Sequence, residues 1–304
     1  MSMDFDPAIP HRLDLLDSYL DRTESRAEKI RPGCEKTIVW SDGEVRQREI
    51  AIVYLHGFSA SRMETSPLFD RLARSMGANL FYTRLTGHGQ DGHAMASATV
   101  EDWLNDGIEA VTIGRRLGKK IILAGTSTGA TLATCLAVQP ALVPLIHSLL
   151  LLSPNYFPKN PLAAAALWPP SFRLFDRFFG GWRNFTITNA RHARYWTIRY
   201  PLTAVATMMQ LVRQSWRVDL ASASMPVLMM VNPWDRVINV SLALFRFRRF
   251  PGPQNKLVLF RGNTDIGRHV LAGDILAPEA TPKALALIQD FLDCVIKDDK
   301  RMTN

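Results

Sequence analysis

Residues 120–129 read KIILAGTSTG and place a serine between two glycines directly after a short apolar run. The apolar run predicts a buried β-strand, and the small residues at 130–138 predict the helix that follows it. The GTSTG segment at 125–129 has the form G-x-S-x-G, which needs a sharp strand-to-helix turn that exposes the serine hydroxyl. Glycine suits both flanking positions, because a Cβ would collide with neighbouring backbone in so tight a turn. We therefore predict Ser127 as a nucleophile at a helix N-terminus; the alternative is a glycine-rich turn without chemistry.

Strands and helices alternate on both sides of this turn. Short apolar runs predict strands at 49–55, 79–83, 120–124, 148–152, 226–231 and 256–260. Helical spacing of apolar residues predicts helices at 66–76, 99–117, 130–138 and 282–296. The alternation predicts an α/β fold, with a mostly parallel, doubly wound sheet that carries helices on both faces.

The alternation stops between residues 154 and 222, which are rich in Pro, Trp, Phe and Arg and show helical pieces but no clear strand. We interpret 154–222 as an insertion into a core built from 34–153 and 223–304. Residues 1–33 form a charged amphipathic segment, which predicts an N-terminal helical extension. The chain shows no internal repeat.

The insertion accounts for almost all of the net positive charge of the chain. The formal net charge of the protein is +8, and nine basic and two acidic residues give the insertion a net charge of +7. Its aromatic residues are Phe157, Trp168, Phe172, Phe175, Phe178, Phe179, Trp182, Phe185, Trp196 and Trp216. These side chains form a small core of the insertion, or together with the arginines a surface for peripheral contact with an anionic membrane. Arginines that bind an acidic substrate group, or that are simply solvated, are the other interpretations.

Composition sets the remaining expectations. No run of 18 uncharged apolar residues predicts a membrane span, and the N-terminus does not resemble a secretory signal. The three cysteines, Cys34, Cys135 and Cys294, have no metal-ligand or disulfide spacing, and we expect Cys135 to be a buried thiol. We therefore expect a cytoplasmic protein, and no metal. Only the calculated pI of 9.6 suggests nucleic acid, and without a recognisable binding module we expect no such partner.

A nucleophilic serine needs a base and an acid that orients the base. His269 lies in a loop nine residues after the last predicted strand, and we predict it as the base. Asp235 follows the strand at 226–231 in an Asn-Pro-Trp-Asp turn, and we predict it as the acid, with Asp265 as the competitor. His192 lies in the arginine-rich insertion, and we interpret it as a polar surface residue.

The same chemistry requires N–H donors for an oxyanion. We assign one to the backbone of Thr128, which follows the nucleophile, and the second to Phe58, in the loop after the strand at 49–55. His56 and Gly57 precede Phe58, and we predict them as substrate-binding residues. For His56, a role as a structural brace of this loop is the preferred alternative to direct catalysis.

Five motifs occur in chain order: HGF at 56–58, LTGHG at 85–89, GTSTG at 125–129, DRVI at 235–238 and HVLAGD at 269–274. Over residues 36–296 they resemble the carboxylesterase and monoacylglycerol-lipase branch of the α/β-hydrolase superfamily. The resemblance implies a serine hydrolase that cleaves carboxylic esters of lipid-like or medium-chain acyl groups through an acyl-enzyme on Ser127, with no cofactor. It also implies that 154–222 is a cap over the active site and that Gly87-His88-Gly89 is structural.

The same residues would also serve a thioesterase, a C–C bond hydrolase or an acyltransferase. A binding protein that holds a ligand under the cap without turnover is the alternative from another class. A dehalogenase would need a carboxylate at the position of Ser127.

Overall fold

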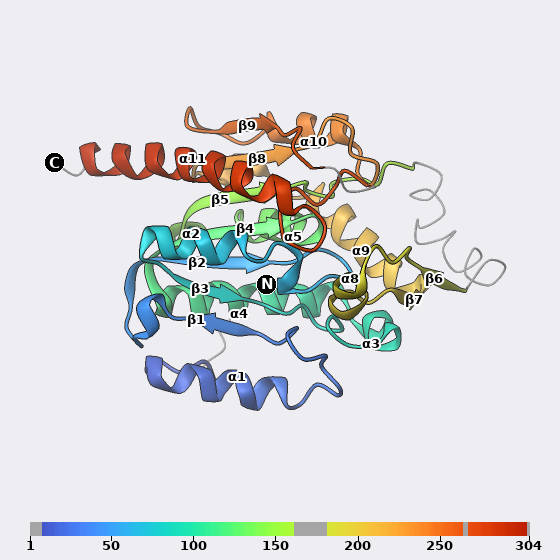
Figure 1. Ribbon diagram of the computed structural model, residues 1–304. Coiled ribbons are helices and arrows are strands. Elements are labelled where there is room, and N and C mark those ends of the chain that lie inside the picture. Colours follow the sequence, from blue (N-terminus) through green and yellow to red (C-terminus); the bar gives the residue numbers. More distant parts are fainter. Residues whose placement is uncertain (1–7, 161–180, 264–266, 303–304) are drawn as a thin grey trace.

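A computed structural model of the chain describes residues 8–160, 181–263 and 267–302 (Figure 1). Within these residues the centre is a seven-stranded sheet in the order β1-β3-β2-β4-β5-β8-β9. The strands are β1 (Thr37–Val39), β2 (Arg48–Leu55), β3 (Asn79–Tyr82), β4 (Gly118–Thr126), β5 (Ile146–Leu152), β8 (Val227–Val231) and β9 (Lys256–Leu259). β1 is antiparallel to β3, and all other neighbouring pairs are parallel. The predicted mostly parallel α/β sheet is confirmed.

Helices cover both faces of the sheet, because the strand residues alternate between two buried clusters. On β2, Ala51, Val53 and Leu55 point into one cluster, whereas Ile52 and Tyr54 point into the other. The first face carries α4 (Val100–Leu117), α5 (Thr128–Leu136) and α10 (Val240–Phe247), and the second carries α2 (Leu68–Met76) and α11 (Thr281–Met302) (Figure 1). Burial on both sides explains why the strands read as continuous apolar runs.

The helix α4 shows how local sequence fixes an element. Thr99 is its N-cap, and a capping box joins the Thr99 and Asp102 side chains to each other's backbone N–H groups. The helix ends at Leu117, and its C-cap, Gly118, is the first residue of β4. A Cβ at Gly118 would collide with the backbone of Ala51 on β2, so only glycine allows the two strands to start side by side.

The chain leaves the sheet after β5 and returns to it at β8. The described part of this segment holds β6 (Trp182–Asn184), α8 (Ala190–Tyr195), β7 (Arg199–Pro201) and α9 (Leu202–Ser215). β6 and β7 pair antiparallel in a small sheet of their own, which the sequence pattern did not predict because three-residue strands are too short to show a period. Figure 1 shows these elements at the carboxyl ends of the parallel strands. The predicted insertion residues Trp168, Phe172, Arg173, Phe175, Arg177, Phe178 and Phe179 lie outside the described residues.

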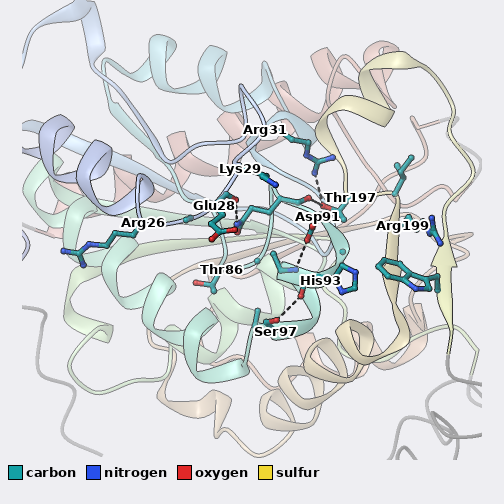
Figure 2. Close-up of a pocket in the computed structure, with 18 residues that line it drawn as sticks. Arg26, Glu28, Lys29, Arg31, Thr86, Asp91, His93, Ser97, Thr197 and Arg199 are labelled. Carbon is teal, nitrogen blue, oxygen red and sulfur yellow. Dashed lines mark hydrogen bonds between the residues drawn. The ribbon is translucent and has the colours of Figure 1, made fainter.

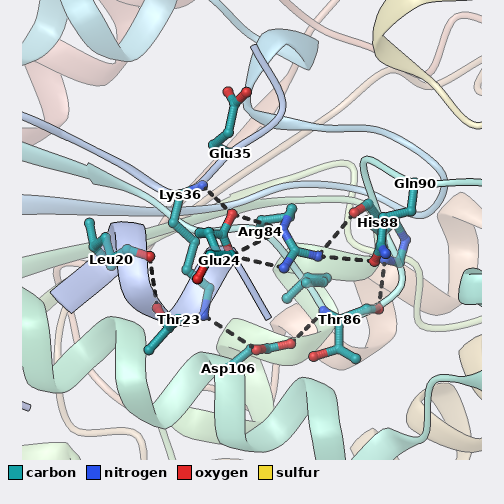
Figure 3. Close-up of polar contacts among 12 residues, drawn as sticks. Leu20, Thr23, Glu24, Glu35, Lys36, Arg84, Thr86, His88, Gln90 and Asp106 are labelled. Atoms are coloured by element: carbon teal, nitrogen blue, oxygen red, sulfur yellow. Dashed lines mark hydrogen bonds and ion pairs between the residues drawn. The ribbon is translucent and has the colours of Figure 1, made fainter. Parts of the chain in front are cut away.

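A network of buried charges fastens the N-terminal segment to the core (Figure 3). Glu24, at the end of α1 (Leu16–Glu24), accepts hydrogen bonds from the guanidinium of Arg84 at 2.8–3.2 Å. Arg84 also donates to the carbonyl of His88 at 3.1 Å, so the same cation holds the 85–89 loop. Beside it, Lys36 pairs with Asp106, and burial raises the pKa of Asp106 to about 6. Breaking such a pair would leave an uncompensated buried charge, which is strongly destabilising.

The described residues also form several short elements. They are α3 (Gly92–Ser97) and the 3-10 turns η1 (Leu13–Leu15), η2 (Ser41–Gly43), η3 (Arg62–Glu64), η4 (Val143–Leu145), η5 (Leu220–Ser222) and η6 (Pro278–Ala280). Cys135 is buried, as predicted, and so is Cys34, whereas Cys294 is exposed. Within the described ranges, none of the helices combines the length and apolar character that a membrane span requires.

Candidate active site

Ser127 stands in the turn between β4 and α5, in a backbone conformation that L-residues rarely adopt. Its φ is 53° and its ψ is −113°. A Cβ at Gly129 would collide with the carbonyl of Leu55, and one at Gly125 would lie 2.5 Å from the backbone of Gly129, so both flanking glycines are required. The Ser127 N–H donates to the carbonyl of Leu152 at 2.8 Å, which holds the turn against β5. Such a strained residue costs about 1–3 kcal/mol and persists only where the surrounding structure enforces it.

The structure brings the predicted serine, histidine and aspartate together. His269 Nε2 lies 2.8 Å from Ser127 Oγ, and His269 Nδ1 lies 2.7 Å from Asp235 Oδ2. Ser127 follows β4, Asp235 follows β8, and His269 follows β9, so all three lie beyond the carboxyl ends of parallel strands. The competing acid, Asp265, lies outside the described residues.

Asp235 has a separate task for each carboxylate oxygen. Oδ1 accepts the backbone N–H groups of Val237 at 2.7 Å and Ile238 at 3.0 Å, and Oδ2 faces His269. The residue is fully buried. Because a carboxylate only accepts, neutral His269 must carry its proton on Nδ1, which leaves Nε2 free to accept the Ser127 hydroxyl proton.

A second set of side chains holds the loops that carry the aspartate and the histidine. Ser153 Oγ donates to the carbonyl of His269 at 2.8 Å. Asn232 Nδ2 donates to Asn263 Oδ1 at 2.7 Å, and Asn263 Nδ2 donates to the carbonyl of Val270 at 3.1 Å. These three side chains were not predicted. The only feature of the sequence that points to such a role is that Ser153 and Asn232 each directly follow a strand.

The two predicted oxyanion donors stand on either side of the serine turn. Thr128 is the first residue of α5, so its N–H has no acceptor within the helix. In the described part of the chain, neither the Thr128 N–H nor the Phe58 N–H has a hydrogen-bond acceptor. The ring of Phe58 packs edge-on against His88 and Tyr200, which fixes the loop that carries its N–H.

His56 and Gly57 have partners inside the protein. His56 is fully buried, and its Nε2 accepts the Leu85 N–H at 3.1 Å. Its Nδ1 must then carry the proton, which it donates to the carbonyl of Gly57 at 2.9 Å. Burial lowers the pKa of His56 to about 4, so the ring is neutral near pH 7. That carbonyl shares a peptide plane with the Phe58 N–H, so these contacts favour the bracing role of His56 over substrate contact.

Two further residues differ from the sequence interpretation. His192 is buried, not a surface residue: its Nδ1 accepts the Thr188 N–H at 3.3 Å and its ring packs edge-on against Trp196. Glu64 was missed altogether. It is 3% exposed, and burial raises the pKa of its carboxyl to about 7. No sequence pattern pointed to Glu64, since a single glutamate after a loop is more often solvated.

A cavity of about 900 Å³ lies near the same loops (Figure 2). Residues from the segments 26–31, 86–98 and 197–199 line it together with Trp182, and Ser127, Asp235 and His269 do not. Two of its basic side chains have partners: Arg31 donates to the carbonyl of Trp196 at 2.6 Å, and Arg199 lies over the Trp182 ring at 4.8 Å. No cluster of three or more His, Cys, Asp or Glu side chains among the described residues is arranged to hold a metal ion.

Solved structures with the same fold include lipolytic enzymes. A structure from work on LipS and LipT, two metagenome-derived lipolytic enzymes, is 19% identical, with a TM-score of 0.69 over 86% of this chain and 100% of that chain. A soluble variant of monoglyceride lipase from Saccharomyces cerevisiae, bound to a substrate analogue, is 15% identical, with a TM-score of 0.66 over 86% and 91%. Est1E from Butyrivibrio proteoclasticus, with ferulic acid bound, is 16% identical, with a TM-score of 0.57 over 88% and 100%. At these identities the likeness is one of fold.

No curated protein matches the chain in sequence. The alpha/beta hydrolase family does match, over residues 52–286, which is more than half of the chain and contains the serine turn, Asp235 and His269. The sheet order and the position of the serine turn agree with this match. The chain therefore belongs to the alpha/beta hydrolase family.

Proposed function

We propose that the protein is a serine hydrolase that cleaves carboxylic esters through an acyl-enzyme on Ser127. The observation that carries the proposal is the continuous hydrogen-bonded chain from Ser127 Oγ through the His269 ring to Asp235, at 2.8 and 2.7 Å. This arrangement is the one that activates a serine hydroxyl, which is otherwise a poor nucleophile.

The reaction has two halves that use the same groups. In the first, Ser127 Oγ attacks the ester carbonyl carbon, its proton passes to His269 Nε2, and the negative oxygen accepts the Phe58 and Thr128 N–H groups. The carbon–oxygen bond to the alcohol then breaks, and His269 returns the proton to the departing alcohol. In the second half, water attacks the acyl-enzyme and gives its proton to His269. The acid leaves, and the proton returns to Ser127.

For the substrate we propose a lipid-like or medium-chain acyl ester. The insertion supports this choice, because its described elements lie at the carboxyl ends of the strands (Figure 1), and its apolar residues Tyr200 and Ala204 pack with Phe58 of the proposed oxyanion loop. The fold neighbours named as lipolytic enzymes and as a monoglyceride lipase support it as well. Thioesters, C–C bonds and acyl transfer would use the same triad, and they are outcomes of the test below.

The test combines a fluorophosphonate probe with p-nitrophenyl esters from C2 to C16. The wild-type protein is expected to be labelled and to turn over esters, and Ser127→Ala is expected to do neither. The acyl chain length with the highest kcat/KM then indicates the length of the acyl pocket. Labelling without ester turnover would retain the triad but move the substrate to a thioester, a C–C bond or an acyl acceptor. Absence of both would favour a binding protein on this fold.

The proposal includes peripheral contact with an anionic membrane through the described part of the insertion. Three apolar side chains there are strongly exposed: Trp182 at 39%, Phe185 at 50% and Ile187 at 49%. Exposed arginines occur in the same segment, at positions 183, 191, 194 and 199, and the guanidinium of Arg199 stacks on Trp182. Exposed aromatic side chains next to arginines are typical of surfaces that bind the headgroup region of anionic bilayers.

A further inference from the structure

Glu64 lies behind the loop that carries the proposed oxyanion donor Phe58. Its Oε2 accepts the Gly57 N–H at 2.8 Å and the Tyr54 hydroxyl at 2.9 Å, and the residue is 3% exposed. The space is tight, since a Cβ at Gly57 would lie 2.6 Å from Glu64 Oε1. The carboxyl therefore reaches the loop only because residue 57 is glycine.

The Glu64 bond completes the fixation of this loop. His56 holds the Gly57 carbonyl, and Glu64 holds the Gly57 N–H, so the peptide units on both sides of Gly57 are pinned. The Phe58 N–H belongs to the second of these units. With both units pinned, the donor direction of Phe58 is set before substrate arrives, which is the condition for efficient oxyanion stabilisation.

A second path leads from Glu64 to the serine turn. The Tyr54 hydroxyl contacts Glu64 on one side and Thr126 Oγ1, at 3.0 Å, on the other. Thr126 is the residue before Ser127. One buried carboxyl thus touches, directly or through one hydroxyl, both the oxyanion loop and the turn that carries the nucleophile.

We propose that Glu64 is a positioning residue of the hydrolase, whose carboxyl holds the Phe58 donor in place through Gly57 and, through the Tyr54 hydroxyl, supports the turn that carries Ser127. The inference rests on the serine-hydrolase function proposed above. The contribution of Glu64 is hydrogen-bond acceptance, which glutamine preserves and leucine removes.

The experiment compares wild type, Glu64→Gln and Glu64→Leu in labelling rate by a fluorophosphonate, and in kcat and KM on the best p-nitrophenyl ester. Glu64→Leu is expected to lower kcat by about 10²-fold with little change in KM, as expected when an oxyanion donor is lost. Glu64→Gln is expected to recover at least about tenfold of that loss, because the amide oxygen still accepts from Gly57.

Asp70→Ala is the matched control. Asp70 also accepts a tyrosine hydroxyl, from Tyr82 at 2.7 Å, but its hydrogen bonds with Tyr82 and Ser66 lie outside the 56–58 loop and the serine turn, so its kcat should equal that of wild type.

The outcomes separate the two proposals. Absence of labelling in wild type would overturn the hydrolase function and the role of Glu64 with it. A wild type that is labelled and active would retain the hydrolase. In that case, a Glu64→Leu protein with wild-type kcat, or a Glu64→Gln protein that recovers none of the lost kcat, would overturn the role of Glu64. If Glu64→Leu fails to fold in thermal melts, Glu64→Met takes its place, because methionine keeps the length of the side chain but not its carboxyl acceptor.

Discussion

The carboxylate of Asp235 divides its two oxygens between backbone and histidine, and this division predicts what an amide would do. In Asp235→Asn the amide oxygen is expected to take the Val237 and Ile238 N–H groups, which turns the amide nitrogen toward His269 Nδ1. A donor there forces the imidazole proton onto Nε2 and removes the base. We expect kcat to fall by about 10⁴-fold with little change in melting temperature.

Asp265→Asn is the control for this variant, because Asp265 is the competing acid in the sequence. It should keep most of the wild-type kcat, measured on the same ester. If Asp265→Asn lost as much activity as Asp235→Asn, the assignment of the acid would be wrong.

The buried ring of His56 makes a prediction about pH and stability. Its pKa is about 4 in the folded protein and near 6.5 when unfolded, so the unfolded state binds a proton more readily. The stabilising contribution of neutral His56 is therefore present above pH 6.5 and is lost as the pH falls toward 4. In a His56→Asn variant, the amide N–H can still donate to the Gly57 carbonyl, but the side chain does not titrate. The free energy of unfolding in urea should fall less steeply between pH 6.5 and 4.5 for His56→Asn than for wild type, and parallel slopes would contradict the prediction.

Part of the site could be predicted from single residues. Ser127, Asp235 and His269 could be selected because each follows an apolar run and they occur in the chain order Ser, Asp, His. Glu64 and Asn263 could not, because their roles come only from contacts with residues distant in the fold or hidden in loops without a pattern.

At the scale of elements, the six predicted strands and four predicted helices all occur, with ends that differ by a few residues. Long apolar runs and capping residues determine these elements locally. The strand β1 was missed, because three residues at the sheet edge show no pattern until they pair with β3. The helix α10 was missed as well, because only Ala243 and Arg246 of its eight residues are buried, so no apolar stripe marks it in the sequence.

The β6–β7 sheet and the residues next to it form the surface for which we predict contact with an anionic membrane. The protein is expected to co-sediment with vesicles that contain anionic lipid at low salt, and less at high salt, since screening weakens the attraction. A Trp182→Ala/Phe185→Ser double variant should bind these vesicles several-fold more weakly, because it removes apolar area from the exposed surface. Trp234→Ala, which removes an exposed tryptophan outside the insertion, is the matched control. Equal binding by all three proteins would exclude this surface.

At the scale of the whole molecule, the buried charges around Arg84 join the N-terminal segment to the sheet. Glu24→Ala is expected to lower the free energy of unfolding by about 3–5 kcal/mol, because it leaves the Arg84 guanidinium buried without its carboxylate. Denaturation in urea measures the change. Asp14→Ala, which breaks an exposed pair with Arg12, should cause no measurable change, and a Glu24→Ala midpoint equal to that of wild type would show that the buried pair is dispensable.

The long sequence separation within the triad has a consequence for biosynthesis. Ser127 and His269 are 142 positions apart, and the strands β8 and β9 that support Asp235 and His269 are made after the insertion. A ribosome therefore completes the proposed nucleophile long before the proposed base, and a nascent or truncated chain that ends before residue 269 would carry an unactivated serine. On the proposed function, the new chain would stay inactive until β9 and the loop with His269 join the sheet. Probe labelling during translation would then time the final step of folding.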